Sequence, residues 1–341
     1  MSITHEYFKV KEAGTKGLGW FAIKDIPAGT CILIEEPIVM VPKPMLDLKE
    51  RDAHAALQTL TKAGKKQFAS LRSVMDYPGH RSASAFSGID PAKLLWHKFR
   101  ANMHSITDPT TKAQSTGVYR LCSLMNHSCL PNAFFTADAG GKRYCRVLTD
   151  VVSGEDITMS YEPAFRFLTT DERKQLVIDK NYNFTCSCDL CTTPAAERLA
   201  SDMRRFLLRR IYIFVKGSDL SPTSKAIDPA QLTTLKAWQR RKQREFGVVV
   251  SFLFAKLCEA EGLLQGDAVF VSYLNAAVTT VQRFQAARLA LSQSALHNVR
   301  LWMQRSIQLS RILGVVDWER FPDAKRARAI VEAAIEKSVG R

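Results

Sequence analysis

The feature that most constrains this chain is a group of closely spaced cysteines near its middle. Cys186, Cys188 and Cys191 form a C-x-C-x-x-C pattern. The first residues, MSITHEYFKVKEAG, lack the long apolar stretch of a secretory signal, so we expect a reducing compartment. Clustered thiols there indicate a metal rather than disulfides. Structural zinc takes four ligands and this pattern supplies three, so the sequence predicts a fourth ligand elsewhere in the chain.

The composition is that of a folded, water-soluble protein. Of its 341 residues, 46% are hydrophobic and 24% are charged, which allows a sizeable buried core. The longest apolar run, near residues 247–255, is too short to span a bilayer. We therefore expect no membrane association and a cytoplasmic and/or nuclear location. The formal charge of +15 indicates acidic partners but does not choose between nucleic acid and protein.

Turn residues and hydrophobic spacing divide the chain into β-rich and helical regions. Runs of β-branched and aromatic residues between turns predict strands at 7–10, 20–23, 31–40, 133–137, 143–149 and 156–160. Between residues 45 and 102 the hydrophobic spacing is helical. Beyond Pro194 it predicts helices at 195–216, 230–263, 268–291 and 295–313, with a last one after Pro322.

Three short motifs hold candidate functional residues, and each alone has an ordinary structural interpretation. The sequence K-G-L-G at 16–19 is a glycine turn between two strands, which is typical of a simple hairpin. Asn126 and His127 lie in an otherwise apolar approach, where amide and imidazole groups need hydrogen-bond partners. The predicted strand in G-E-D-I-T-M-S-Y leads to Tyr161, which alone is typical of a core or rim tyrosine.

The order of these motifs along the chain resembles that of the SET-domain methyltransferases. A β-rich start with a G-x-G turn is followed by N-H-S-C-x-P-N, then G-E-D-I-T-M-S-Y, then C-x-C-x-x-C. More narrowly, residues 7–44 and 97–194 resemble the SMYD-type branch and related SET-domain proteins of fungi. One departure is plain: residues 45–100 contain no cysteine, so the zinc-binding MYND finger of SMYD proteins is absent.

The resemblance implies an α+β protein with the small β-sheets of the SET fold. Residues 1–165 would form the SET domain, interrupted by a helical insertion at about 45–116. A post-SET zinc-binding segment would follow at 166–194. An all-helical C-terminal domain, tetratricopeptide-like in texture, would occupy residues 195–341.

The resemblance also assigns roles to individual residues. Cys129 would join the three clustered cysteines in one structural zinc site, and Tyr161 would be the catalytic residue that positions the acceptor amine. The implied cofactor is S-adenosylmethionine, with contacts from Lys16, Gly17, Leu18, Gly19, Asn102, Asn126, His127, Tyr182 and Phe184. Asn126 and His127 would hold the cofactor through side-chain and main-chain hydrogen bonds. Ordinary packing beside the zinc explains the last two aromatic residues equally well. The other cysteines are interpreted as small core residues: Cys31, Cys122, Cys145 and Cys258.

The resulting prediction is an S-adenosylmethionine-dependent N-methyltransferase that acts on a lysine side-chain amine of a protein, histone or non-histone. Two alternatives stay open. One is a SET-fold enzyme with a small-molecule acceptor, and the other is a non-catalytic SET scaffold for protein interaction. We expect a monomer that binds a protein substrate.

Two groups of basic residues lie in the predicted C-terminal helices. They are Arg204, Arg205, Arg209 and Arg210, and Arg240, Arg241, Lys242 and Arg244. Apolar residues interleave with both groups, and no recognised nucleic-acid-binding motif accompanies them. We therefore favour solvated helix faces over a nucleic-acid patch.

Overall fold

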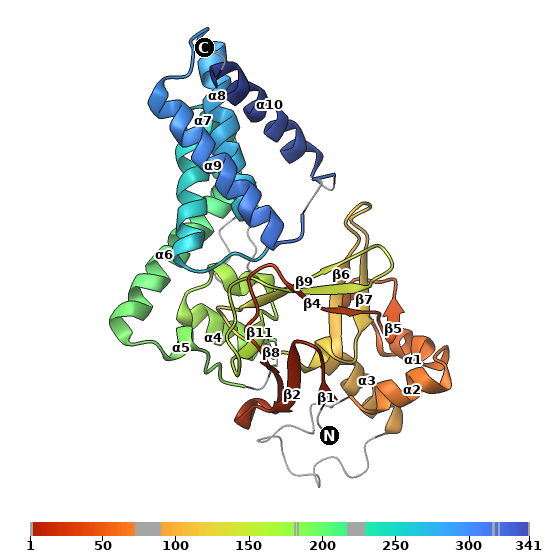
Figure 1. Cartoon of the computed structure of the whole chain (residues 1–341). Helices are drawn as coiled ribbons and strands as arrows, with labels where there is room; N and C mark the ends of the chain where they lie inside the picture. The colour runs from red at the N-terminus through yellow and green to blue at the C-terminus, as the bar shows by residue number, and fades with distance from the viewer. Residues whose placement is uncertain are drawn as a thin grey trace. The chain divides into compact units, whose positions relative to one another are not determined.

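A computed structural model of the chain describes residues 3–71, 90–180, 182, 184–216, 229–315, 318–319 and 321–339 (Figure 1). The chain divides into two compact units. Unit 1 comprises Met1–Asn126 and Asn132–Met159, and unit 2 comprises His127–Pro131 and Ser160–Arg341. Each unit is described by itself.

Small β-sheets make up most of unit 1, as expected for an α+β protein with this β-rich sequence. The strands are β1 (Ile3–Thr4), β2 (Phe8–Glu12), β3 (Leu18–Ala22), β4 (Cys31–Glu35), β5 (Val39–Val41), β6 (Met103–Thr107), β7 (Gln114–Val118), β8 (Asn126–His127), β9 (Ala133–Ala137), β10 (Arg143–Val147) and β11 (Asp156–Met159). They form three sheets, with the orders β1-β2-β3-β11-β8, β4-β10-β9 and β5-β7-β6.

The core of the first sheet follows from the alternation of its strands. In β2, Phe8 and Val10 are buried while the residue between them is exposed, because successive side chains point to opposite faces. Phe8 stacks on Trp20 of β3, with ring centroids 3.8 Å apart. The Trp20 indole N–H donates to the Leu121 carbonyl at 3.2 Å. The sheet thereby holds the segment that leads to Asn126.

Residues 31–40, expected as one strand, form two strands in different sheets. Strand β4 ends at Glu35 and β5 begins at Val39. Pro37 lies between them, and proline cannot donate to a strand ladder. The expected hairpin of β9 and β10 is confirmed, with Arg143 opposite Ala137.

The expected helical insertion contains α1 (Glu50–Gln58), α2 (Lys62–Ala69) and α3 (Pro91–Asn102). Its helical character does not extend past Asn102. Strands β6 and β7 follow as an antiparallel hairpin, with Met103 opposite Val118. The β-branched residues of these strands, among them Ile106 and Thr116, suit a half-buried sheet.

Unit 2 is mainly helical (Figure 1). Its helices are α4 (Thr170–Asp179), α5 (Asp189–Thr192), α6 (Ala195–Lys216), α7 (Pro229–Ala260), α8 (Ala268–Ala286), α9 (Gln293–Ile312) and α10 (Pro322–Val339). The five predicted C-terminal helices are thus confirmed. The helices α7 and α8 end earlier than expected, before Gly262 and Arg288. These two residues have φ angles of 64° and 57°, which are incompatible with a right-handed α-helix.

Consecutive helices of the C-terminal region pack against one another. Helix α7 packs on α6 and α8, and α8 also packs on α9 and α10. Within the described ranges, every helix is too short or too polar to cross a membrane.

Candidate functional site

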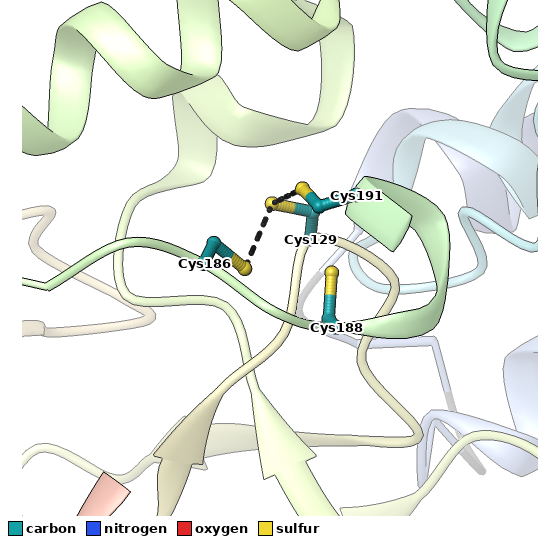
Figure 2. Close-up of side chains that lie close together, drawn as sticks. All are labelled: Cys129, Cys186, Cys188 and Cys191. Carbon is teal, nitrogen blue, oxygen red and sulfur yellow. Dashed lines mark hydrogen bonds between the residues drawn. The ribbon is translucent and has the colours of Figure 1, made fainter. Parts of the chain in front are cut away.

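Four cysteine sulfurs converge in unit 2 at a candidate metal centre (Figure 2). Cys129, Cys186, Cys188 and Cys191 place their Sγ atoms within 4.8 Å of one another. The Cys129 sulfur lies 3.8 Å from that of Cys186 and 3.6 Å from that of Cys191. Tetrahedral zinc with Zn–S bonds of about 2.3 Å separates its sulfurs by about 3.8 Å. The donor set and its spacing therefore fit a four-thiolate metal site.

Local backbone structure explains how the cysteine pattern reaches this geometry. Cys188 precedes the short helix α5, and its carbonyl accepts the Cys191 N–H at 2.8 Å, so the C-x-x-C pair shares one turn. Cys129 comes from the loop at 127–131. There the Ser128 hydroxyl accepts the Leu130 N–H at 3.1 Å and shapes the backbone.

His127 connects this centre to the expected catalytic tyrosine. The Tyr161 backbone N–H donates to His127 Nδ1 at 3.2 Å, so Nδ1 carries no proton. The ring proton of the neutral imidazole is therefore on Nε2, which lies 3.4 Å from the Cys129 sulfur and donates to it. Both ring nitrogens have partners within the protein. The expected contact of His127 with the cofactor stays a prediction.

Tyr161, Tyr182 and Phe184 form an aromatic cluster around His127. Ring centroids are 5.6 Å apart for Tyr161 and Tyr182, and 6.2 Å apart for Tyr161 and Phe184. Phe184 in turn lies 5.8 Å from the His127 ring. Tyr161 is 36% exposed, so one side of the cluster is open to solvent. The structure thus brings together the expected site residues of unit 2.

Glu162 adds to this cluster a carboxylate that the sequence motifs did not single out. The Tyr182 hydroxyl donates to Glu162 Oε1 at 2.7 Å, and Lys180 Nζ lies 3.6 Å from the same oxygen. Burial, with the adjacent Glu162 charge, raises the pKa of the Tyr182 phenol well above its usual value. Tyr182 is therefore a neutral donor held in place by Glu162. The only sequence signal was an acidic residue directly after Tyr161.

The glycine turn in unit 1 lies beside Asn126. Gly17 has a φ angle of 76°, which favours glycine. A Cβ atom added to Gly19 would lie 2.5 Å from Asn126 Nδ2 and 3.5 Å from Asp156 Oδ1. Within the described residues, both of those buried atoms lack a hydrogen-bond partner. Only a glycine therefore lets the strand pass so close to this unpaired donor and this unpaired acceptor.

Asp156 is the second functional candidate that the sequence motifs did not single out, although it lies within the strand that leads to Tyr161. Its other carboxylate oxygen is 3.4 Å from Lys16 Nζ. Burial raises the pKa of the Asp156 carboxyl, and the charge of Lys16 opposes the shift. The expected turn residue Lys16 is thus placed over β11 by an ion pair.

Asn102 is linked to the same region through backbone contacts. It is buried at the end of α3, and its side-chain amide donates to the Lys98 carbonyl at 2.8 Å. Its own carbonyl accepts the Ser123 hydroxyl at 3.1 Å. Ser123 belongs to the segment before Asn126, which Glu35 also holds by accepting the N–H groups of Leu121 and Cys122 at 2.7 and 2.8 Å.

The first basic group on α6 is not a solvated face, which corrects that expectation. Arg205 is fully buried and Arg209 is 8% exposed. Arg205 Nε donates to Glu261 at 3.0 Å, and Arg209 pairs with Glu172 at 2.9 Å. Carboxylates from distant parts of the chain, buried for Glu261 and half-buried for Glu172, make this burial tolerable. Arg210 is exposed as expected. The side chains of Arg240, Arg241, Lys242 and Arg244 lie outside the described residues.

The interpretation of the remaining cysteines as core residues is confirmed for three of them. Cys122, Cys145 and Cys258 are each at most 1% exposed, and burial raises the pKa of each thiol, to about 12 for Cys258. Cys31 is half-buried, and its thiol donates to the Leu33 carbonyl at 3.6 Å.

One protein family matches part of this chain. Residues 17–162 match the family described as SET domain. The chain is similar to the histone-lysine N-methyltransferase set5 of Schizosaccharomyces pombe, with 28% identity over 202 residues, or 59% of this chain and 55% of the relative.

Two further relatives share shorter regions with the chain. The protein-lysine N-trimethyltransferase SMYD5 of Gallus gallus is 35% identical over 83 residues, 24% of this chain and 20% of that protein. The N-lysine methyltransferase SMYD2 of Homo sapiens is 28% identical over 120 residues, 35% of this chain and 27% of that protein. The chain therefore spans about half or less of the length of the relatives it matches.

Proposed function

Residues 17–162 match the SET-domain family, and on that premise we propose that the chain is an S-adenosylmethionine-dependent methyltransferase whose acceptor is a lysine amine of a protein. The observation that carries the proposal is the aromatic cluster of Tyr161, Tyr182 and Phe184, tied through His127 to the four-cysteine centre. The names of three similar proteins, which specify lysine methylation, support a protein-lysine acceptor.

The polar groups of unit 1 fit the amino-acid part of this cofactor. An amino acid at neutral pH carries one ammonium and one carboxylate group. Among the described residues, Asn126 Nδ2 is an unpaired donor that suits a carboxylate, and Asp156 Oδ1 is an unpaired acceptor that suits an ammonium. The missing side chain at Gly19 allows the backbone to approach both atoms closely. When bound, the cofactor supplies an electrophilic methyl group on a positively charged sulfur.

The aromatic cluster of unit 2 fits a long aliphatic amine. The faces of Tyr161 and Tyr182 attract a cation, and the carboxylate of Glu162 adds negative charge beside them. A lysine must lose its proton before its nitrogen accepts a methyl group, and removal from water among these rings favours the neutral amine. The Tyr161 hydroxyl orients the amine nitrogen, which contributes to rate through positioning.

The four-cysteine centre is proposed to hold one structural zinc ion. Cys129, Cys186, Cys188 and Cys191 match the all-sulfur tetrahedral preference of structural zinc. Its role is to fix the loop at 127–131 against the segment at 184–191. The chain then presents His127 and, through it, the backbone of Tyr161 in a defined position.

The cofactor assignment is tested by calorimetric binding of S-adenosylhomocysteine, the product form of the cofactor. The wild-type chain should bind it, and Gly19→Ala should weaken binding at least about tenfold, because the new Cβ would lie 2.5 Å from Asn126 Nδ2 and displace that side chain. Gly140→Ala is the matched control, since its nearest neighbour would lie at an ordinary 3.4 Å. Absence of binding by the wild-type protein would favour a non-catalytic scaffold.

The acceptor class is tested by transfer of a radiolabelled methyl group into a cell lysate that is then resolved by size. The proposal predicts label in the protein fraction. Label confined to small molecules would contradict the protein acceptor while leaving the cofactor assignment intact.

A further inference from the structure

Three buried charged residues join helix α6 to the cysteine-bearing segment of unit 2. They are Arg173 on α4, Arg205 on α6 and Glu261 just after α7, and we call them the arginine bridge. Their exposed fractions are 1%, 0% and 6%. Long charged side chains are almost never buried this deeply without a specific partner. Each buried charge of the bridge must therefore be balanced by specific partners.

Each guanidinium nitrogen of Arg205 has a hydrogen-bond partner, and those of Nη1 and Nη2 lie on the segments around the cysteine centre. Its Nε donates to Glu261 at 3.0 Å, and Nη1 donates to the carbonyls of Phe165 and Arg166 at 2.9 and 3.0 Å. Its Nη2 donates to the carbonyl of Cys129 at 3.4 Å. One buried guanidinium thus connects α6 directly to a proposed metal ligand.

Glu261 is shared between the bridge and α6. It accepts the Ser201 hydroxyl at 2.7 Å and also pairs with Arg204. Next to it, Gly262 approaches the cysteine loop so closely that an added Cβ would lie 2.9 Å from Leu130 Cδ1. The residues just after α7 therefore contact both helix α6 and the loop at 127–131.

Arg173 has little negative charge near it among the described residues. Nη1 donates to the Leu168 carbonyl at 2.7 Å, and Nη2 donates to Thr170 at 3.0 Å. Its Nε lacks a partner among the described residues, and its nearest carboxylate, Asp202, lies 3.8 Å away. Nη2 also points at the Cys191 sulfur, at 3.9 Å. A buried cation with so weak a counter-charge is costly.

A metal held by four thiolates supplies the missing negative charge. Four thiolates around a divalent ion leave a net charge of minus two. We propose that Arg173 and Arg205 are the charge-balancing outer shell of the four-cysteine centre, and that metal binding thereby fixes helix α6 on the cysteine-bearing segment. Outer-shell partners of this kind orient the ligands and contribute to metal affinity.

Metal binding and the packing of helix α6 should stabilise each other, because both depend on the same contacts. With metal bound, the thiolates stabilise the buried guanidinium of Arg173, and Asp202 stays free to accept the Thr170 N–H at 2.7 Å. Without metal, the four-thiolate complex beside Arg173 is lost, and with it the counter-charge that this complex supplies. Helix α6 carries Arg205 and Asp202. It then loses part of the contacts that fix it to the cysteine-bearing segment.

The first test compares zinc affinity of full-length variants, using a chromophoric chelator as competitor. Arg173→Met should bind zinc about 10- to 100-fold more weakly than wild type, as expected when an outer-shell partner is lost. Lys174→Met is the matched control, because it removes the same charge from an exposed position of α4 and should not change the affinity. Equal zinc affinities for folded Arg173→Met and Lys174→Met would overturn the proposal.

The second test needs no variant, so it holds even if Arg173→Met does not fold. Hydrogen exchange is measured on the wild-type chain with zinc bound and after chelation. Amides of α6 between residues 201 and 209 should exchange at least about tenfold faster without metal, while those of α9 should not change. Unchanged exchange in α6, or a purified chain that takes up no zinc, would overturn the proposal. Neither test uses methyl transfer, so the inference can fail while the proposed activity stands.

Discussion

At the residue scale, the charge of Glu162 is the feature that most separates this aromatic cluster from ordinary packing. Tyr182 donates to it at 2.7 Å, and a glutamine in its place keeps the acceptor oxygen but loses the charge. Glu162→Gln should raise KM for a lysine peptide about fivefold, or ~1 kcal/mol, and leave kcat unchanged. The measurement is steady-state kinetics at low and high salt. A kcat effect equal to the KM effect would contradict a role in attracting the amine, and Asp171→Asn is the exposed control.

The buried imidazole of His104 should make the free energy of unfolding depend on pH. Burial and the adjacent Arg143 hold its pKa well below the usual value of about 6.5. Below about pH 6.5 the unfolded chain binds a proton that the folded ring does not, so the free energy of unfolding falls as pH falls. The slope is at most about 1.4 kcal/mol per pH unit, down to the folded pKa.

The His104 prediction is checked by denaturant unfolding at several pH values. His104→Gln retains an acceptor for Arg143, at 3.2 Å in the wild type, and should flatten the loss of stability on acidification. His297→Gln, on the exposed face of α9, is the control. Identical slopes for His104→Gln and wild type would show that His104 is not the titrating group.

The residues that sequence patterns left unassigned share one property: their partners are distant in the chain. Arg205 was expected on a solvated face, and no local pattern points to Glu261, which is 56 positions away. The sequence also gives no sign that Asn126 Nδ2 and Asp156 Oδ1 lack hydrogen-bond partners among the described residues, because this depends on the packing around them. The cysteines were different, because short spacing and thiol chemistry together indicate a metal from the sequence alone.

At the scale of elements, local signals predicted helices better than strand boundaries. The start of α9 is marked by Ser292, whose hydroxyl accepts the Ala295 N–H at 3.2 Å, and such caps are readable in sequence. The hairpin of β6 and β7 was missed because strand pairing depends on a partner at a distance. The split between β4 and β5 was recoverable from Pro37.

The element that carries the cysteines gives a prediction that requires only a thiol count. With metal bound, the four cluster thiols are protected, and Cys122, Cys145 and Cys258 are buried. A chelator added to the native chain should therefore expose four additional thiols to a chromogenic reagent. The full denatured chain contains eight. An unchanged native count on chelation, or a gain of two, would contradict a four-thiolate site.

At the scale of the whole molecule, the charge of +15 is less informative than its distribution. Part of it is neutralised inside unit 2, where Arg205 and Arg209 meet Glu261 and Glu172. Each unit also carries a distinct part of the proposed chemistry. Unit 1 holds Gly19 with Asn126, and unit 2 holds the aromatic cluster and the four-cysteine centre. The activity proposed here therefore requires both units of the chain.

The most direct measurement is methyl transfer from labelled S-adenosylmethionine to protein, followed by hydrolysis and identification of the labelled amino acid. Wild type should yield methylated lysine. Tyr161→Phe should reduce the rate at least about 100-fold while its affinity for S-adenosylhomocysteine stays within about twofold of wild type, because the hydroxyl acts on the acceptor. No labelled lysine from wild type, or equal loss of rate and cofactor affinity in Tyr161→Phe, would contradict the account.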